Sequence, residues 1–232
     1  ATSGQRILLE VTCNGHQMGE EFDIEGKPTF QCHVMGTEGI ESVEIFRFRP
    51  GCEEAKMVYS HPINADVPPS NRVKIVWSGL RQRYRYFQTV WDGSLTLSDG
   101  RILEAKGYAV DTPLEGIIEW TERQVTWRSQ TVGDEDGIVL AIDAPPEARL
   151  QIKTQPCSFE ITWGETGTGP TVFEAGGIGQ KVFVKRLPDA TSPWEVSFLW
   201  VDDQPPLEGG AYYFKVTQID GAVAYSSPFY IR

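Results

Sequence analysis

The chain has 232 residues, of which 40% are hydrophobic and 23% charged, and its formal net charge is −11. This composition is typical of a globular protein and excludes wholesale disorder, while the charge predicts that the protein as a whole binds neither nucleic acid nor anionic membrane. No apolar stretch reaches the ~18 residues of a membrane-spanning helix.

Short runs rich in β-branched and aromatic residues follow one another along the whole chain. Turn residues such as Gly, Pro, Asp and Asn separate most of them, and no window of about 11 residues shows a helical period. The sequence therefore predicts an all-β protein. The runs cover residues 6–15, 29–36, 41–51, 73–79, 94–103, 123–129, 137–143, 149–154, 158–164, 181–187, 194–203, 212–218 and 223–231.

The spacing of these runs predicts two β units. Residues 1–79 with 191–232 supply the roughly seven strands of an immunoglobulin or fibronectin-III sandwich. Residues 80–190 then form a second β-rich domain, inserted between strands of the first. Such an insertion is tolerated where the two ends of a loop lie close together.

The last two runs predict a hairpin that closes the first sandwich. Period-2 alternation places Tyr212, Phe214, Val216 and Gln218 on its core face, with Tyr213 and Lys215 toward solvent. The Asp220-Gly221 dipeptide predicts a two-residue turn, because both positions tolerate positive φ.

No segment carries a catalytic motif. The chain has no GxSxG, HExxH or CxxC spacing, and its glycine-rich stretch 164–181 lies between strands instead of opening a helix. We therefore predict no catalytic residue, no metal and no cofactor, although a carboxylate pair from distant strands stays open. The four Cys leave one disulfide open but do not assign it.

Three features are weak candidates for binding. Asp134 and Asp136 precede a Gly, as in the opening of a calcium loop, but the distal Glu is missing and a solvated hairpin turn is the favoured interpretation. Arg81, Arg83 and Arg85 alternate with aromatic residues, which fits a binding surface or simply one polar face of a strand.

The chain has seven Trp, each of which could fill the core or form part of an exposed binding surface. Most lie in alternating runs and are expected in the core, where Trp fills a large volume. Trp91 adjoins a turn and is the candidate for an exposed binding surface.

The end of the chain is similar to a widespread bacterial family of uncharacterised proteins in which a PHP-type (polymerase-and-histidinol-phosphatase) metallohydrolase domain precedes a β-rich region. The chain matches the family's terminal motif except at two positions. It has Lys215 where the family usually has Arg, and Tyr225 where the family usually has Trp. The matching residues are Tyr212, Tyr213, Val216, Thr217, Gln218, Asp220, Gly221, Ala224, Ser226, Ser227 and Pro228.

The start, residues 1–21, also resembles the exit from that catalytic domain, and residues 76–102 and 125–143 resemble the family's middle. With no initiator Met and no signal peptide, the resemblance implies a processed or excised C-terminal β region. The family's metal-binding His and Asp motifs would lie upstream.

The resemblance implies a non-catalytic accessory domain that packs on, or shields, the upstream catalytic domain of the same parent protein. The alternative is an independent carbohydrate-binding or lectin-like module, which the seven Trp and the acidic charge motivate. An enzyme in its own right is the third hypothesis, which the missing nucleophile and metal motifs disfavour. No part of the sequence assigns a compartment or an oligomeric state.

Overall fold

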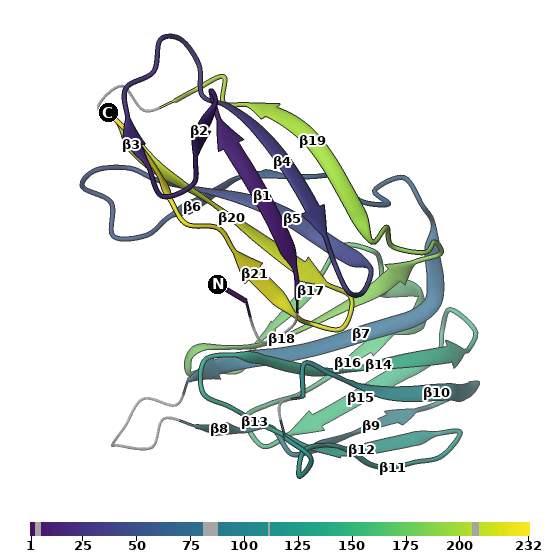
Figure 1. Ribbon diagram of the computed structural model, residues 1–232. Coiled ribbons are helices and arrows are strands. Elements are labelled where there is room, and N and C mark those ends of the chain that lie inside the picture. Colours follow the sequence, from purple (N-terminus) through teal and green to yellow (C-terminus); the bar gives the residue numbers. More distant parts are fainter. Residues whose placement is uncertain (3–5, 81–87, 111, 206–208) are drawn as a thin grey trace. The chain divides into compact units, whose positions relative to one another are not determined.

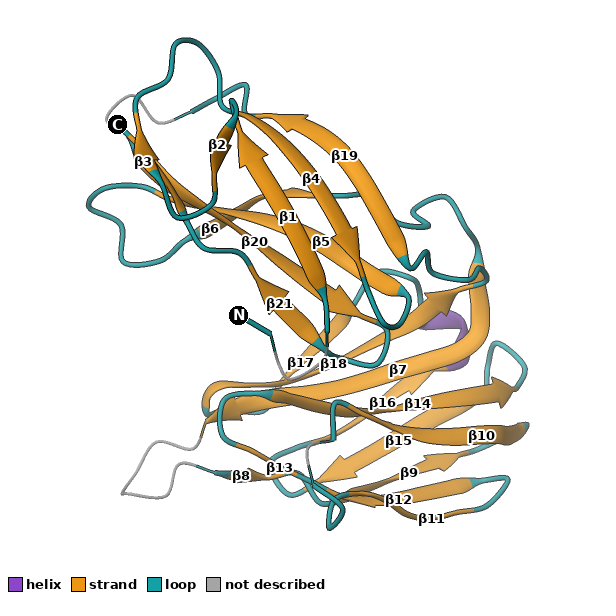
Figure 2. Cartoon of the chain, viewed as in Figure 1, coloured by secondary structure: helices purple, strands orange, loops and turns teal. Residues whose placement is uncertain are grey.

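A computed structural model describes the chain except for residues 3–5, 81–87, 111 and 206–208. Nearly all described elements are strands in antiparallel sheets, which confirms the all-β prediction (Figures 1 and 2). A 3-10 turn at Trp163–Glu165 is the one helical element of the described part.

The chain divides into two compact units, residues 1–65 with 191–232 and residues 66–190. The predicted boundary after residue 79 is wrong by one strand. Strand β7 (Pro69–Leu80) pairs with β14 (Glu135–Asp143) on one side and with β18 (Ile178–Pro188) on the other, and both partners belong to the second unit. The chain re-enters the first unit after residue 190, as the sequence predicts.

The first unit packs two sheets around one core. The four-stranded sheet has the order β19-β4-β1-β2, and the six-stranded one has β3-β22-β20-β5-β6 with β21 on β20. Buried residues from both sheets, such as Phe30 and Phe214, form a single cluster. The strands are β1 (Leu8–Cys13), β2 (His16–Gln17), β3 (Glu21–Phe22), β4 (Thr29–Met35), β5 (Ile40–Phe48), β6 (Lys56–Ser60), β19 (Glu195–Val201), β20 (Gly210–Gln218), β21 (Val223–Tyr225) and β22 (Phe229–Ile231).

The second unit also packs two five-stranded sheets, in the orders β10-β14-β7-β18-β17 and β11-β12-β9-β15-β16. The pair β13-β8 adds a small third sheet. In its core the rings of Trp77 and Trp127 stack with centroids 5.1 Å apart. The remaining strands are β8 (Thr89–Val90), β9 (Gly93–Leu97), β10 (Arg101–Tyr108), β11 (Gly116–Trp120), β12 (Gln124–Arg128), β13 (Gln130–Thr131), β15 (Arg149–Thr154), β16 (Ser158–Thr162) and β17 (Thr171–Glu174).

The terminal hairpin lies in the first unit, where β20 pairs with β5. Tyr212, Phe214, Val216 and Gln218 are all fully buried, as their alternation predicts. The turn is one residue longer than predicted, because the N–H of Gln218 pairs with the carbonyl of Ala222 and leaves three residues in the connection. Gly221 takes the left-handed position at φ 90°, which suits a three-residue loop.

Candidate functional site

Among the described residues, the sequence-predicted candidates do not come together. Arg81, Arg83 and Arg85 lie outside the described residues. Trp91 is fully buried, so the prediction of an exposed surface there is wrong. Its indole Nε1 donates to Oγ1 of Thr131 (2.9 Å), which satisfies its polar atom inside the core.

Asp134 lies in the turn before β14 and Asp136 within that strand, and they do not form one set of ligands. Asp136 is 1% exposed, and its Oδ2 accepts a hydrogen bond from Oγ of Ser129 (2.6 Å). Asp134 is exposed and its Oδ1 accepts from the N–H of Val132. The alternation of β14 turns the second carboxylate inward, which separates it from the first.

Most Trp side chains belong to the cores. Trp77, Trp91, Trp127 and Trp163 are buried, and Trp200 packs against the core of the first unit. The exposed ones are Trp120 and Trp194, and they lie in different units. Neither unit therefore shows a pair of exposed Trp among its described residues.

A patch of large apolar side chains covers the outer face of the six-stranded sheet. We call it the aromatic face. Tyr213 stands opposite Phe46 in the ladder, and their rings stack nearly parallel with centroids 5.0 Å apart. Tyr225, Tyr230, Met57 and Phe48 are between 37% and 54% exposed. The face consists of Phe46, Phe48, Met57, Tyr213, Tyr225 and Tyr230.

Charged residues also lie on this face. Glu21 stands opposite Tyr230 and pairs with Arg232 (2.9 Å). Lys215 stands between Tyr225 and Glu44 in the register of β21, β20 and β5. The pKa of Tyr213 is raised, first by its burial and then by the neighbouring Tyr225. Tyr213 is therefore a neutral hydrogen-bonding and apolar group at physiological pH.

A hollow of about 460 Å³ lies over the four-stranded sheet. Its floor is one cross-strand row in which Glu10 of β1, His33 of β4 and Ser197 of β19 stand side by side. Thr12 and Gln31 belong to the next row. The lining residues are Glu10, Thr12, Gln31, Cys32, His33, Ser197 and Phe198.

The Ser–His pair in this hollow lacks the geometry of an activated nucleophile. Oγ of Ser197 lies 2.8 Å from Nδ1 of His33, and Oε1 of Glu195 lies 3.8 Å from the same nitrogen. An acyl-transfer site also needs donors aimed at an oxyanion, whereas the backbone N–H groups of β4, a central strand, belong to the sheet ladders. Burial raises the pKa of the Cys32 thiol to about 12, so this sulfur is no nucleophile either.

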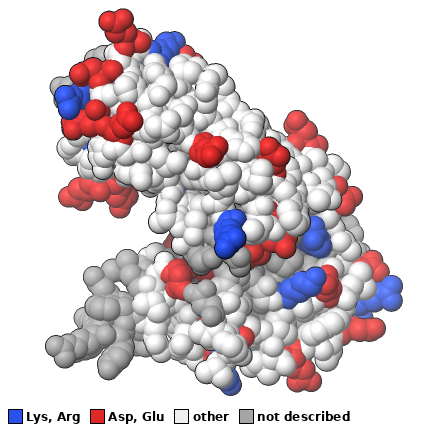
Figure 3. Space-filling view, in the orientation of Figure 1, with Lys and Arg blue, Asp and Glu red and all other residues white. Residues whose placement is uncertain are grey.

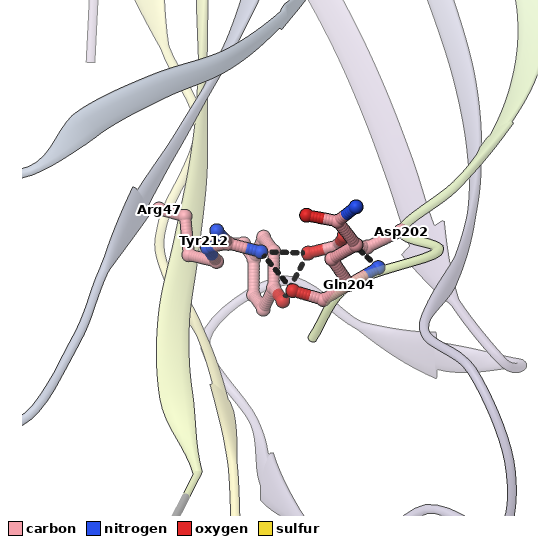
Figure 4. Close-up of polar contacts among 4 residues, drawn as sticks. All are labelled: Arg47, Asp202, Gln204 and Tyr212. Carbon is pink, nitrogen blue, oxygen red and sulfur yellow. Dashed lines mark hydrogen bonds and ion pairs between the residues drawn. The ribbon is translucent and has the colours of Figure 1, made fainter. Parts of the chain in front are cut away.

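A buried polar network joins the two sheets of the first unit (Figure 4). Nη1 of Arg47 lies 2.5 Å from Oδ2 of Asp202 and 2.6 Å from the carbonyl of Gln204. The hydroxyl of Tyr212 donates to the same Oδ2 over 2.7 Å. Burial and this bond raise the pKa of Tyr212. The network fixes the connection from β19 to β20 and is a structural feature.

Neither surface is evident from sequence patterns alone. Alternation correctly predicts Tyr213 and Lys215 on the solvent side of the hairpin, but it does not link them to Phe46 of a distant strand. A search for outward-facing aromatics on neighbouring strands could have found the aromatic face. The hollow has no comparable signal, because its floor depends on the register of three strands.

Within the described ranges, no group of three His, Cys, Asp or Glu residues is placed to hold a metal ion. No helix in the same ranges is long and apolar enough to cross a membrane. No family model matches this sequence, and comparisons with curated proteins and with solved structures give no match.

Proposed function

We propose that this chain is the non-catalytic C-terminal accessory β region of a PHP-type metal-dependent hydrolase, and that it packs on the catalytic domain of that parent protein. The observation that carries the proposal is the aromatic face. Monomeric proteins rarely expose a contiguous apolar patch of this kind without a partner. The charged residues on this face largely pair with each other: Lys215 stands opposite Glu44, and Arg232 forms an ion pair with Glu21 at the β3–β22 edge.

The first two residues pair with a strand of the aromatic face. Ala1 exchanges two backbone hydrogen bonds with Tyr225 (2.8 and 2.7 Å), and Thr2 bridges to Ala224. Tyr225 belongs to the aromatic face. A catalytic domain joined before Ala1, as the resemblance expects, would therefore be tethered at the edge of this face.

We further propose that the first unit is a fibronectin-III-type sandwich. In chain order, β1, β4 and β19 correspond to strands A, B and E of such a domain, and β5, β20 and the β21–β22 pair to C, F and G. The second unit then occupies the connection before strand E. Tyr212 near the start of β20, bonded back to Asp202, stands where such sandwiches have their tyrosine corner.

The reading frame upstream of Ala1 tests the proposal directly. The frame is expected to continue into a PHP-type domain with its metal-binding His and Asp motifs. A start codon immediately before the Ala1 codon, or an unrelated upstream domain, would contradict it. In the complete protein, cross-linking followed by mass spectrometry should connect the catalytic domain to lysines beside the aromatic face, such as Lys215.

Substitutions on the aromatic face supply a second test in the complete protein. Tyr213→Ser with Tyr225→Ser removes two rings from the proposed contact and should separate the domains, measured as faster proteolysis of the linker. The matched control is Thr12→Ala on the other sheet. Unchanged proteolysis would show that the face is not the contact.

An independent carbohydrate-binding module is the alternative function. The exposed ring of Tyr225 beside Lys215 and that of Tyr230 beside Glu21 favour it, because sugars stack on aromatic rings while charged groups bond their hydroxyls. The Phe46 and Tyr213 rings stack on each other, which leaves less ring surface for a sugar. Binding of neutral oligosaccharides by the isolated chain, lost in Tyr225→Ser, would support this alternative.

A further inference from the structure

We infer that the hollow and the adjoining edge of β19 form a docking site for an extended basic segment of a partner protein, which adds to the four-stranded sheet as a fifth strand. This inference does not depend on the proposed function, because it concerns the opposite sheet of the first unit.

The edge of β19 is the first observation. β19 pairs with β4 and with no other described strand, and it is the last strand of its sheet (Figure 1). Along its seven residues, alternate N–H and C=O groups therefore point away from the sheet, which is the template that an added strand uses. Its outward side chains include Leu199, which is 58% exposed, so the edge also offers apolar contact.

The hollow is the second observation. It lies directly beside this edge, since Ser197 and Phe198 of β19 belong to its lining. A strand added to β19 places every second side chain on the outer face, next to Ser197 and over the hollow. Main-chain bonds to the edge would supply affinity, and the hollow would select one side chain, as in other complexes formed by strand addition.

Charge decides which side chain fits. Glu195 flanks the hollow on the near strand and Glu10 on the far strand, with His33 between them. No Lys or Arg lies among the lining residues. Within the described ranges, Glu10 has no ion-pair partner, and Glu195 has only the 3.8 Å contact with His33. A Lys or Arg side chain of the added strand would form ion pairs with these carboxylates.

A second copy of this chain is a poorer occupant. Antiparallel self-pairing of β19 would bring another acidic strand, with Glu195, to the same edge. The chain is acidic overall, and Figure 3 shows acidic side chains gathered at the end of the first unit that carries the C-terminus. Like charges therefore oppose this dimer.

Three synthetic seven-residue peptides test the inference, each acetylated and amidated. The first has Lys at the three even positions, Val between them and Thr at both ends. The second replaces each Lys with Glu. The third keeps Lys but replaces each Val with Pro, which has no N–H to donate. Binding to the whole chain is followed by backbone amide NMR shifts and by calorimetry.

The Lys–Val peptide should bind with shifts centred on β19 and β4, and the other two should bind at least about threefold more weakly. Glu195→Gln should weaken the Lys–Val peptide about threefold, in the range of one exposed ion pair, and Glu10→Gln by less. Glu44→Gln on the other sheet is the matched control and should change nothing. Denaturant unfolding of each variant checks that the fold is retained.

Several outcomes would overturn the inference. Equal binding of the Lys–Val and Lys–Pro peptides would mean charge attraction without strand addition. Equal binding of the Glu peptide, absence of binding, or shifts confined to other strands would each reject the site. Sedimentation showing a dimer that uses β19, and that the peptide does not dissociate, would assign the edge to a second copy instead.

Discussion

The hydroxyl of Tyr212 donates to Oδ2 of Asp202 across 2.7 Å, and both side chains are buried. The same carboxylate faces Arg47, whose side chain is 11% exposed. Burial alone would lower the pKa of Arg47, but its bonds with Asp202 and Tyr212 outweigh this effect and raise it. The three residues come from β5, β20 and the segment that joins β19 to β20, so they link strands far apart in the sequence.

Removing the Tyr212 hydroxyl and removing the Asp202 carboxylate should destabilise the first unit to different degrees. Tyr212→Phe loses one bond to a charged group, which costs about 1.5–3 kcal/mol. Asp202→Ala leaves the guanidinium of Arg47 buried without its counter-charge, which costs about 3–5 kcal/mol. Urea unfolding measures both. Tyr213→Phe, on the outer face of the same strand, is the control and should change little.

Truncation after Ile219 should prevent the first unit from folding. It removes β21 and β22, with Phe229 and Ile231 at 0% and 9% exposure, and it opens the ladder beside β20. Each large buried side chain contributes about 1.5–3 kcal/mol, and their sum approaches the stability of a typical domain. We expect an insoluble or molten product in solubility and near-ultraviolet circular dichroism measurements. A soluble product with an unchanged cooperative melt would disprove the closing role of the hairpin.

The stability of the first unit should fall as the pH drops below about 6.5. The ring of His61 stacks on Phe198 with centroids 4.2 Å apart, and burial lowers its pKa from the ordinary value of 6.5. The unfolded chain therefore takes up a proton before the folded one does, so this contribution is complete above pH 6.5 and is lost as the pH falls toward the folded pKa. Urea midpoints between pH 7.5 and 5 measure the loss.

His61→Phe is the matched variant for this pH dependence, because it keeps a ring on Phe198 but cannot titrate. Its midpoints should vary less over the same interval than those of the wild type. An identical pH profile in both proteins would assign the dependence to other groups.

The isolated chain should bind no transition metal in stoichiometric amount and should hydrolyse no phosphoester. The reason is the proposed division of labour, in which metal-binding residues belong to an upstream domain. Elemental analysis after dialysis against Zn²⁺ or Mn²⁺, with a chromogenic phosphodiester assay, measures both properties. Metal-dependent turnover that co-purifies with the chain through two orthogonal columns would refute the expectation.

Local sequence patterns determined the fold class of this protein and the burial of many of its side chains. Period-2 alternation is a property of the strand itself, so the sequence correctly predicted an all-β chain, the burial of Tyr212, Phe214 and Val216, and the outward direction of Tyr213. The position of most Trp in alternating runs likewise indicated that they would be buried. These features need no knowledge of which strands pair.

Only the tertiary structure decided which strands are neighbours. From its position in the sequence, β7 was predicted to belong to the first unit, but its pairing with β14 and β18 places it in the second. Trp91 adjoins a turn, yet it is fully buried in the core of the second unit. The aromatic face and the hollow depend on the registers Phe46–Tyr213 and Glu10–His33–Ser197, and such registers are set by long-range pairing of backbone hydrogen bonds, which no local stretch of sequence specifies.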